Sequence, residues 1–390
     1  MPIVTFKFKL KFLSPAFIGS AHPVRASEFR LQSLKGVMRY WWRMTQNWTN
    51  PNRLFEKERS LFGYTERASP FSMRIDERSN LQFEANRNAY LPDEPHSGRA
   101  YLFFSCRKQG RNQPGRKKWI KPGSFLTFSI RFFTGDEATI EEVIFSLWLA
   151  QTFGGLGARS RRAAGSFQIT IDQIPAKLSD MSELFLLTAS NLKEQVLSNN
   201  PTEWYMRLIH RDSPLAMAFN SSDHFKETGT HASADKLLDI IGNTMRNYRA
   251  VFGGGGAVFR SDARNLYSYA VSDRRTTYSG SDPLPKHAFG LPIIYNFRRR
   301  RGRGLEPYYI EAVPDGYERR ASPLFISVKQ NHNKEYYANL LLLWQEFLPV
   351  RTRIHLNVKR RGSSGPPVKS HTVQPPANED PIVTFIRSVP

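Results

Sequence analysis

The segment FGGLGARSRRAAGSF, residues 153–167, combines the two residue types that most often bind phosphate. Glycine lets the backbone approach a phosphate closely, and arginine both pairs with phosphate in a bidentate manner and stacks on bases. An alternative is equally consistent with the motif alone: the glycines end a helix and the arginines solvate a surface loop. The residues concerned are Gly154, Gly155, Gly157, Arg159, Arg161, Arg162 and Gly165.

The glycine spacing does not match the standard nucleotide-binding loops. A dinucleotide fingerprint needs G-x-G-x-x-G between a strand and a helix, whereas Gly155-Leu-Gly157 is followed by Ala158, Arg159 and Ser160. The third glycine is missing, and the expected order here is helix, loop, strand. The P-loop pattern G-x-x-x-x-G-K-[ST] does not occur in the chain. We therefore expect no nucleotide cofactor.

A second basic feature is the row formed by Lys35, Arg39 and Arg43 in SLKGVMRYWWRMTQNW. Residues four apart lie on one face of a helix, so the three cations are expected to stack. Taken alone, the row favours an ordinary solvated helix face. The tryptophans of this segment are expected mainly in the core, but Trp42 lies beside the row and is a candidate for an exposed surface on which a base stacks.

No complete catalytic set stands out. Metal-dependent cleavage of a phosphodiester needs clustered carboxylates, but the loop 14–33 contains only Glu28. Metal-free RNA cleavage needs a general acid and base, and His22 beside Arg25 is the candidate there. The single cysteine, Cys106, excludes an intrachain disulfide and a cysteine-based metal cluster. We expect a non-enzymatic protein without a metal, and a metal-independent RNA endonuclease using His22 is the alternative.

The charge of the chain indicates a polyanionic partner. Its 390 residues include 56 Lys and Arg against 34 Asp and Glu, a net charge of +22. Nucleic acid and anionic membrane are the candidates, and the membrane is the weaker one because no long apolar run or amphipathic basic terminal helix is present. Basic loops at 107–121 and 298–303 favour a long anionic ligand. The lone cysteine and the alternating N-terminal segment favour a cytoplasmic protein.

The hydrophobic pattern of the first 172 residues predicts the order β, α, several β, α, β. This order is that of a ferredoxin-like domain, an antiparallel sheet covered on one face by two helices. Alternation predicts the first strand, and apolar spacing of three and four predicts the helices, with Ser33 as the N-cap of the first. The expected strands are 3–13, 71–75, 100–106, 124–133 and 166–171, and the expected helices are 33–48 and 139–155.

The second half is predicted to be richer in helices. Helices are expected at 181–198, 201–210, 233–251 and 334–348, and strands at 290–297, 307–313, 323–330 and 353–358. The tail after residue 358 is rich in Pro, Ser and Gly and is expected to be mobile, with IVTFI as a candidate last strand. We predict an α+β protein with two ferredoxin-like domains. The first is 1–175, with the glycine-rich loop at 154–165, and the second is 176–390, degenerate and with helical insertions.

These segments resemble the RAMP superfamily of CRISPR-associated proteins, whose ferredoxin-like domains carry a glycine-rich loop after the second helix. GGLGARSRR occupies that place, and Ala164 departs from a glycine that is common there. LKGVMRYWWR is similar to the early helix of the first-numbered subunits of type III-B Cmr effector complexes. FGLPIIY and RRASPL are similar to their second domain. The resemblance covers residues 3–172 and, more loosely, 289–330.

The resemblance implies a non-catalytic, RNA-binding subunit of a Cmr ribonucleoprotein for antiviral defence, in which other subunits cleave the target. Single-stranded RNA, guide or target, and other Cmr subunits are the implied partners, with no membrane. Whether the glycine loop grips RNA or braces the packing of the two domains is open, and its arginines favour RNA contact. The candidate RNA-binding residues are Lys35, Arg39, Trp42, Arg43, Gly154, Gly155, Gly157, Arg159, Arg161 and Arg162.

Overall fold

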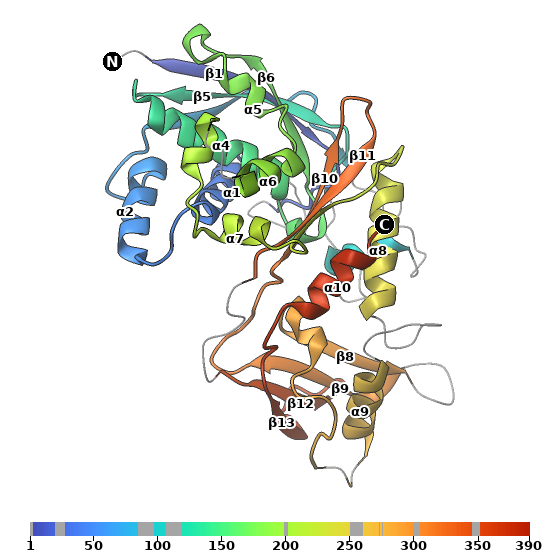
Figure 1. The fold of residues 1–390 in the computed structure, drawn as a ribbon. Coiled ribbons are helices and arrows are strands. Elements are labelled where there is room, and N and C mark those ends of the chain that lie inside the picture. Colours follow the sequence, from blue (N-terminus) through green and yellow to red (C-terminus); the bar gives the residue numbers. More distant parts are fainter. Residues whose placement is uncertain are drawn as a thin grey trace. The chain divides into compact units, whose positions relative to one another are not determined.

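A computed structural model describes residues 3–19, 28–84, 97–106, 119–198, 202–249, 260–272, 274, 276–298, 305–344 and 352–390 (Figure 1). The chain forms two compact units. Unit 1 comprises Met1–Asn243, Phe325–Leu343 and Val389–Pro390, and unit 2 comprises Thr244–Leu324 and Trp344–Ser388. The domain boundary predicted near residue 175 was based on the expected order of helices and strands. The two compact units do not test that boundary, so it stays a prediction.

Unit 1 contains the ferredoxin-like arrangement predicted from the sequence. Its sheet has the order β2-β5-β1-β6, and all three pairs of neighbouring strands are antiparallel. Helices α1 and α4 lie on one face of this sheet (Figure 1). The alternation in β1 puts Phe6, Phe8, Leu10 and Phe12 in the core. The elements in chain order are β1 (Val4–Phe12), α1 (Leu31–Met44), β2 (Phe71–Glu77), β5 (Phe125–Phe132), α4 (Glu137–Phe153) and β6 (Phe167–Gln173).

Further elements surround this domain within unit 1. They include a three-stranded sheet of order β10-β11-β7, in which β11 pairs with β7 antiparallel. None of the described helices is both long and apolar enough to cross a membrane. The additional elements are α2 (Pro51–Phe62), β3 (Phe83–Glu84), α3 (Gly98–Leu102), β4 (Trp119–Ile120), α5 (Met181–Leu184), α6 (Ala189–Ser198), η4 (Trp204–Leu208), α7 (Pro214–Asn220), β7 (Phe225–Glu227), β10 (Leu324–Gln330) and β11 (Tyr336–Leu342).

A buried lysine joins the β10–β11 hairpin to the C-terminal end of α4. Lys329 is 6% exposed and donates hydrogen bonds to the carbonyl oxygens of Gln151 and, at 3.1 Å, Phe167. Ser327 and Asn339 both donate to the carbonyl oxygen of Thr152, at 2.6 and 3.1 Å. Because the last carbonyls of a helix have no partner inside it, these side chains satisfy groups that would otherwise be buried unpaired. Burial lowers the pKa of Lys329 to about 7.

Unit 2 is built on a four-stranded antiparallel sheet of order β13-β12-β9-β8. Its core includes Leu266, Ile310, Leu356 and Val358. Together with unit 1, this sheet confirms the α+β class with ferredoxin-like domains and helical additions. The elements are α9 (Arg260–Val271), β8 (Ile293–Arg298), β9 (Leu305–Pro314), β12 (Ile354–Arg360), β13 (Lys369–Val373) and α10 (Asp380–Ser388), and α8 (Ala234–Arg249) contributes to both units.

Five predictions about individual elements are wrong. The described part of the segment 334–348, up to residue 344, contains strand β11 instead of a helix, because a run of leucines fits both the helical and the strand period. Residues 100–106 lie in α3 and a 3-10 helix instead of a strand, and the side chain of Ser97 caps α3 by accepting from the N–H of Ala100 at 3.1 Å. IVTFI lies in α10, and the tail expected to be mobile also forms β13. Helix α1 begins at Leu31, so Ser33 is not its N-cap.

Candidate nucleic-acid interface

The glycine-rich loop between α4 and β6 is hydrogen-bonded to the protein itself. The N–H of Leu156 donates to the carbonyl oxygen of Gly165 at 2.9 Å, and the N–H of Gly165 donates to that of Pro15 at 2.8 Å. The N–H of Ala158 donates to the carbonyl oxygen of Phe17 at 3.0 Å. These three donors are therefore engaged by the loop and by the segment after β1, not directed at a ligand.

Two of the loop glycines are required by this folding. Gly165 has a φ of +66°, and a Cβ atom there would lie 2.0 Å from the carbonyl oxygen of Leu156. Gly157 has a φ of +94°, and a Cβ atom there would lie 2.7 Å from the carbonyl oxygen of Phe17. Both contacts are within unit 1. The protein's own packing thus accounts for these glycines, and contact of the loop glycines with RNA stays a prediction.

The three arginines of the loop differ in exposure. Arg162 is 7% exposed, whereas Arg159 and Arg161 are partly exposed. The guanidinium carbon of Arg161 lies 4.4 Å from the ring centroid of Phe325 in β10 and 5.8 Å from that of Tyr40 in α1. The two rings lie 5.7 Å apart. Arg161 is therefore held by cation–π contacts at a surface where three elements of unit 1 meet.

A pocket of about 210 Å³ lies at this meeting point. It brings together the two segments that the sequence analysis singled out separately, the early helix and the glycine loop. To these the fold adds Phe325, which sequence reasoning missed because it lies far along the chain. The lining residues are Gly36, Val37, Tyr40 and Trp41 from α1, Gly154, Gly155, Ser160 and Arg161 from the loop, and Phe325.

Gly36 is the lining residue whose type is hardest to explain by packing. It is exposed in the interior of α1, where glycine costs about 1 kcal/mol relative to alanine. A Cβ atom built on Gly36 would meet no other atom within 4 Å. By contrast, a Cβ on Gly154 would lie 2.3 Å from the carbonyl oxygen of Ala150, so the helix itself requires that glycine. Gly36 instead leaves the helical side of the pocket open.

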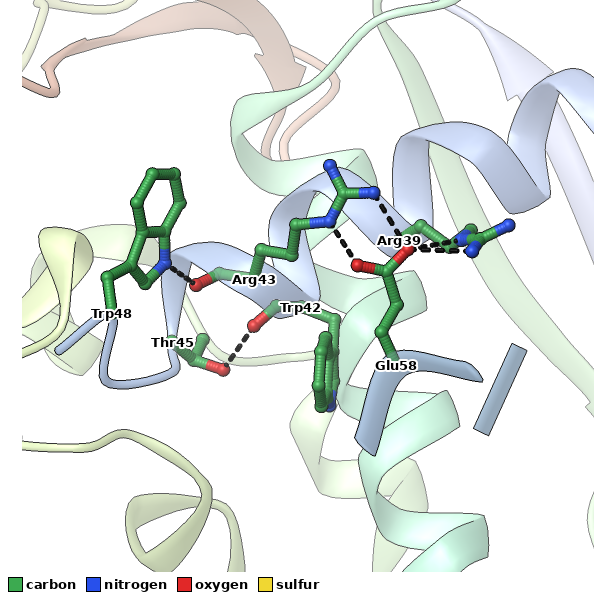
Figure 2. Close-up of polar contacts among 6 residues, drawn as sticks. All are labelled: Arg39, Trp42, Arg43, Thr45, Trp48 and Glu58. Atoms are coloured by element: carbon green, nitrogen blue, oxygen red, sulfur yellow. Dashed lines mark hydrogen bonds and ion pairs between the residues drawn. The ribbon is translucent and has the colours of Figure 1, made fainter. Parts of the chain in front are cut away.

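The predicted cationic row on α1 is organised by a carboxylate from α2 (Figure 2). Glu58 is 2% exposed, and its carboxylate accepts from the Nε of Arg39 at 2.8 Å and from the Nη2 of Arg43 at 2.7 Å. The arginine side chains are each 34% exposed. Lys35 is placed differently, with its Nζ 4.6 Å from the ring centroid of Phe71. The structure thus brings Arg39 and Arg43 together on one anion.

The charges in this cluster shift the pKa values of their neighbours. Burial by itself raises the pKa of Glu58, but the hydrogen bonds and charges of Arg43 and Arg39 outweigh it and hold that pKa below its usual value. The hydrogen bond to Glu58 raises the pKa of Arg43, while burial and the charge of Arg39 lower the pKa of Lys35. Near neutral pH, the row retains an excess of positive charge that is fixed in position.

The exposure of Trp42 and Trp48 is the reverse of what the sequence predicted. Trp42 is 2% exposed, and its Nε1 donates to Glu142 at 2.7 Å, so the prediction of an exposed stacking surface at Trp42 is wrong. Trp48, expected in the core, is 39% exposed, and its Nε1 donates to the carbonyl oxygen of Arg43 at 2.8 Å (Figure 2). The cause is that α1 ends at Met44, so the helical period no longer applies to Trp48.

Several candidates lie outside the described residues. They are His22 and Arg25, residues 107–118 of the first basic loop and residues 299–303 of the second. Within the part of the chain that the structure describes, no group of three or more His, Cys, Asp or Glu side chains is placed to hold a metal ion. Cys106 is buried.

Comparison with known proteins shows the family. The model of the RAMP superfamily matches residues 9–168. The CRISPR system Cmr subunit Cmr1-2 of Pyrococcus furiosus is 31% identical over 181 residues, which are 42% of this chain and 93% of that protein. The chain belongs to the Cmr1 family of the RAMP superfamily. A second Cmr1 protein of the same organism, Cmr1-1, is 27% identical over 345 residues, or 84% of each chain.

Two solved structures share the fold. The apo form of Cmr1 from Pyrococcus furiosus matches with a TM-score of 0.51 and 19% identity over 90% of both chains. A chain of the type III-B Cmr-beta complex, solved bound to cognate target RNA, matches with a TM-score of 0.52 and 13% identity over 100% of this chain and 99% of that one. At these identities the likeness extends to the fold alone.

The folding role of the loop can be tested with Gly165→Ala and a matched control, Gly123→Ala. Gly123 also has a positive φ, +84°, but a Cβ atom there meets nothing within 4 Å. The control therefore carries only the backbone cost, about 1–2 kcal/mol of unfolding free energy. Gly165→Ala adds a clash, which we expect to cost about a further 1–3 kcal/mol. Denaturant unfolding measures both, and equal losses would contradict the packing role of Gly165.

Proposed function

We propose that this chain is a non-catalytic, RNA-binding subunit of a type III-B Cmr ribonucleoprotein, where it contacts guide RNA or target RNA in antiviral defence. The curated relatives are Cmr subunits, and one structural neighbour was solved in a complex bound to target RNA. The net charge of +22 is suited to a polyanion. The observation that carries the proposal is the pocket at which Arg161, Tyr40 and Gly36 meet.

The chemistry of this surface suits single-stranded RNA. Arginine pairs with phosphate and stacks on bases, and aromatic rings beside it offer faces or edges to bases. Glu58 fixes Arg39 and Arg43 on the neighbouring turns of α1, which lowers the conformational entropy that phosphate binding would cost. RNA is therefore contacted through side chains, while base pairing between guide and target reads sequence.

The proposal assigns no cleavage step to this chain. In the described ranges, neither a metal-ligand cluster nor a histidine lines the pocket. The alternative, a metal-independent RNA endonuclease, depends on His22, which lies outside those ranges. We expect labelled RNA to stay intact when incubated with the purified chain, and the remaining Cmr subunits would carry cleavage.

The salt dependence of RNA affinity tests the role of the two partly exposed loop arginines. We expect Arg159→Ala/Arg161→Ala to weaken binding of single-stranded RNA and to reduce the slope of log Kd against log salt by about 0.7–1.4, since each lost phosphate contact contributes about 0.7. The control is Arg74→Ala/Arg211→Ala, which removes the same charge at two exposed positions outside the pocket. Equal slopes for the two double variants would contradict the proposed site.

Gly36→Ala separates binding from stability. Alanine should raise the unfolding free energy by about 0.5–1 kcal/mol, because it is the better helix former and meets no neighbour. If RNA enters the pocket along α1, the added methyl group should weaken RNA binding roughly fivefold, or about 1 kcal/mol. Ser33→Ala, at an exposed position of the same helix, should leave affinity unchanged. A Gly36→Ala protein that gains stability and keeps full affinity would remove Gly36 from the interface.

A further inference from the structure

A second, chemically opposite concavity lies elsewhere in unit 1. A groove of about 660 Å³ is formed between α5 with the loop after it and the residues that begin η4. Leu184 and Tyr205 are buried there, at 1% and 5% exposure, whereas Leu186 is 83% exposed. The groove also takes in Leu187 and Trp204. The lining is therefore mixed in polarity, and Leu186 and Trp204 offer a partner an apolar contact within it.

The charged residues of the groove are all acidic. Asp180, Glu183 and Glu203 line it, although the chain as a whole carries +22. Across the described residues, no lysine, arginine or histidine lies within 4.0 Å of these three carboxylates. Burial raises the pKa of Tyr205, and the charges of Glu203 and Glu183 raise it further. The negative charges of two carboxylates in the groove therefore reach the hydroxyl group of Tyr205.

Two classes of ligand fit this surface poorly. RNA would bring phosphates against three carboxylates, and like charges at an interface cost affinity. A metal ion would need converging ligands, and within the described part of the chain these carboxylates do not form such a group. A basic polypeptide segment fits both properties, because its lysines or arginines pair with the carboxylates and an apolar side chain covers Leu186 and Trp204.

We propose that this groove docks a segment of a neighbouring protein subunit that carries an aliphatic or aromatic side chain flanked by lysine or arginine. The partner protein is thus recognised by a surface that repels RNA, while RNA is recognised by a surface rich in arginine. None of the residues lining the groove lines the pocket at Arg161. Binding of partner and binding of RNA are therefore separable by mutation.

The test uses the full chain, assembled with the other purified subunits of its Cmr complex, and so rests on the proposed membership of that complex. Two variants change the groove, Glu183→Lys and Leu186→Ser, and two controls make the same changes elsewhere, Glu66→Lys and Val368→Ser. Both aliphatic positions are exposed, Leu186 at 83% and Val368 at 61%, so folding should be preserved, which thermal unfolding checks. We expect each groove variant to enter the complex at least about tenfold more weakly than its control.

A photo-crosslinking amino acid at position 186 identifies the occupant. We expect cross-links to a basic, apolar segment of another subunit. Cross-links to RNA or to a second copy of this chain would overturn the proposal, as would groove variants that assemble as tightly as their controls. The RNA affinity of the isolated variants is measured in parallel. Groove variants that lose assembly but keep their RNA affinity support docking at the groove. The RNA affinity of the arginine variants tests the proposed function and not the groove.

Discussion

The carbonyl groups at the C-terminal end of α4 are the constraint on which the candidate interface depends. Lys329, Ser327 and Asn339 of the β10–β11 hairpin donate to the last carbonyls of this helix or to the strand that follows it. The same helix end leads directly into the glycine loop. One set of buried hydrogen bonds therefore fixes both the hairpin that supplies Phe325 and the loop that supplies Arg161. Without this junction, the pocket would lack two of its three sides.

The glycines and the arginines of the loop have different roles. The glycines with positive φ allow the chain to close on its own carbonyl groups, and the arginines supply charge at the surface that results. A loop that is already hydrogen-bonded holds Arg161 with little further loss of entropy on binding. The acidic Glu58 acts in the same way on α1, because it fixes two cations that would otherwise repel each other. In both places, the protein orders its cations before a ligand arrives.

The sequence was sufficient for features that depend on local periodicity. Alternation in β1 and the apolar spacing of α4 predicted the ferredoxin-like order, and the i, i+4 spacing predicted the cationic row. It was insufficient where a distant segment decides the outcome. The stacking of Arg161 on Phe325 joins residues more than 160 positions apart, and Glu58 lies in a helix that was not predicted. Trp42 was misplaced because its burial depends on Glu142 and Phe62, neither of which is adjacent in sequence.

In the proposed function, RNA lies against α1, the glycine loop and β10 of unit 1. Ultraviolet cross-linking of RNA in the assembled particle, followed by peptide mapping, measures this directly. We expect cross-links in peptides that contain Tyr40, Arg161 or Phe325, and a lower yield of these cross-links when Gly36→Ala narrows the pocket. Cross-links confined to peptides outside these three segments would contradict it.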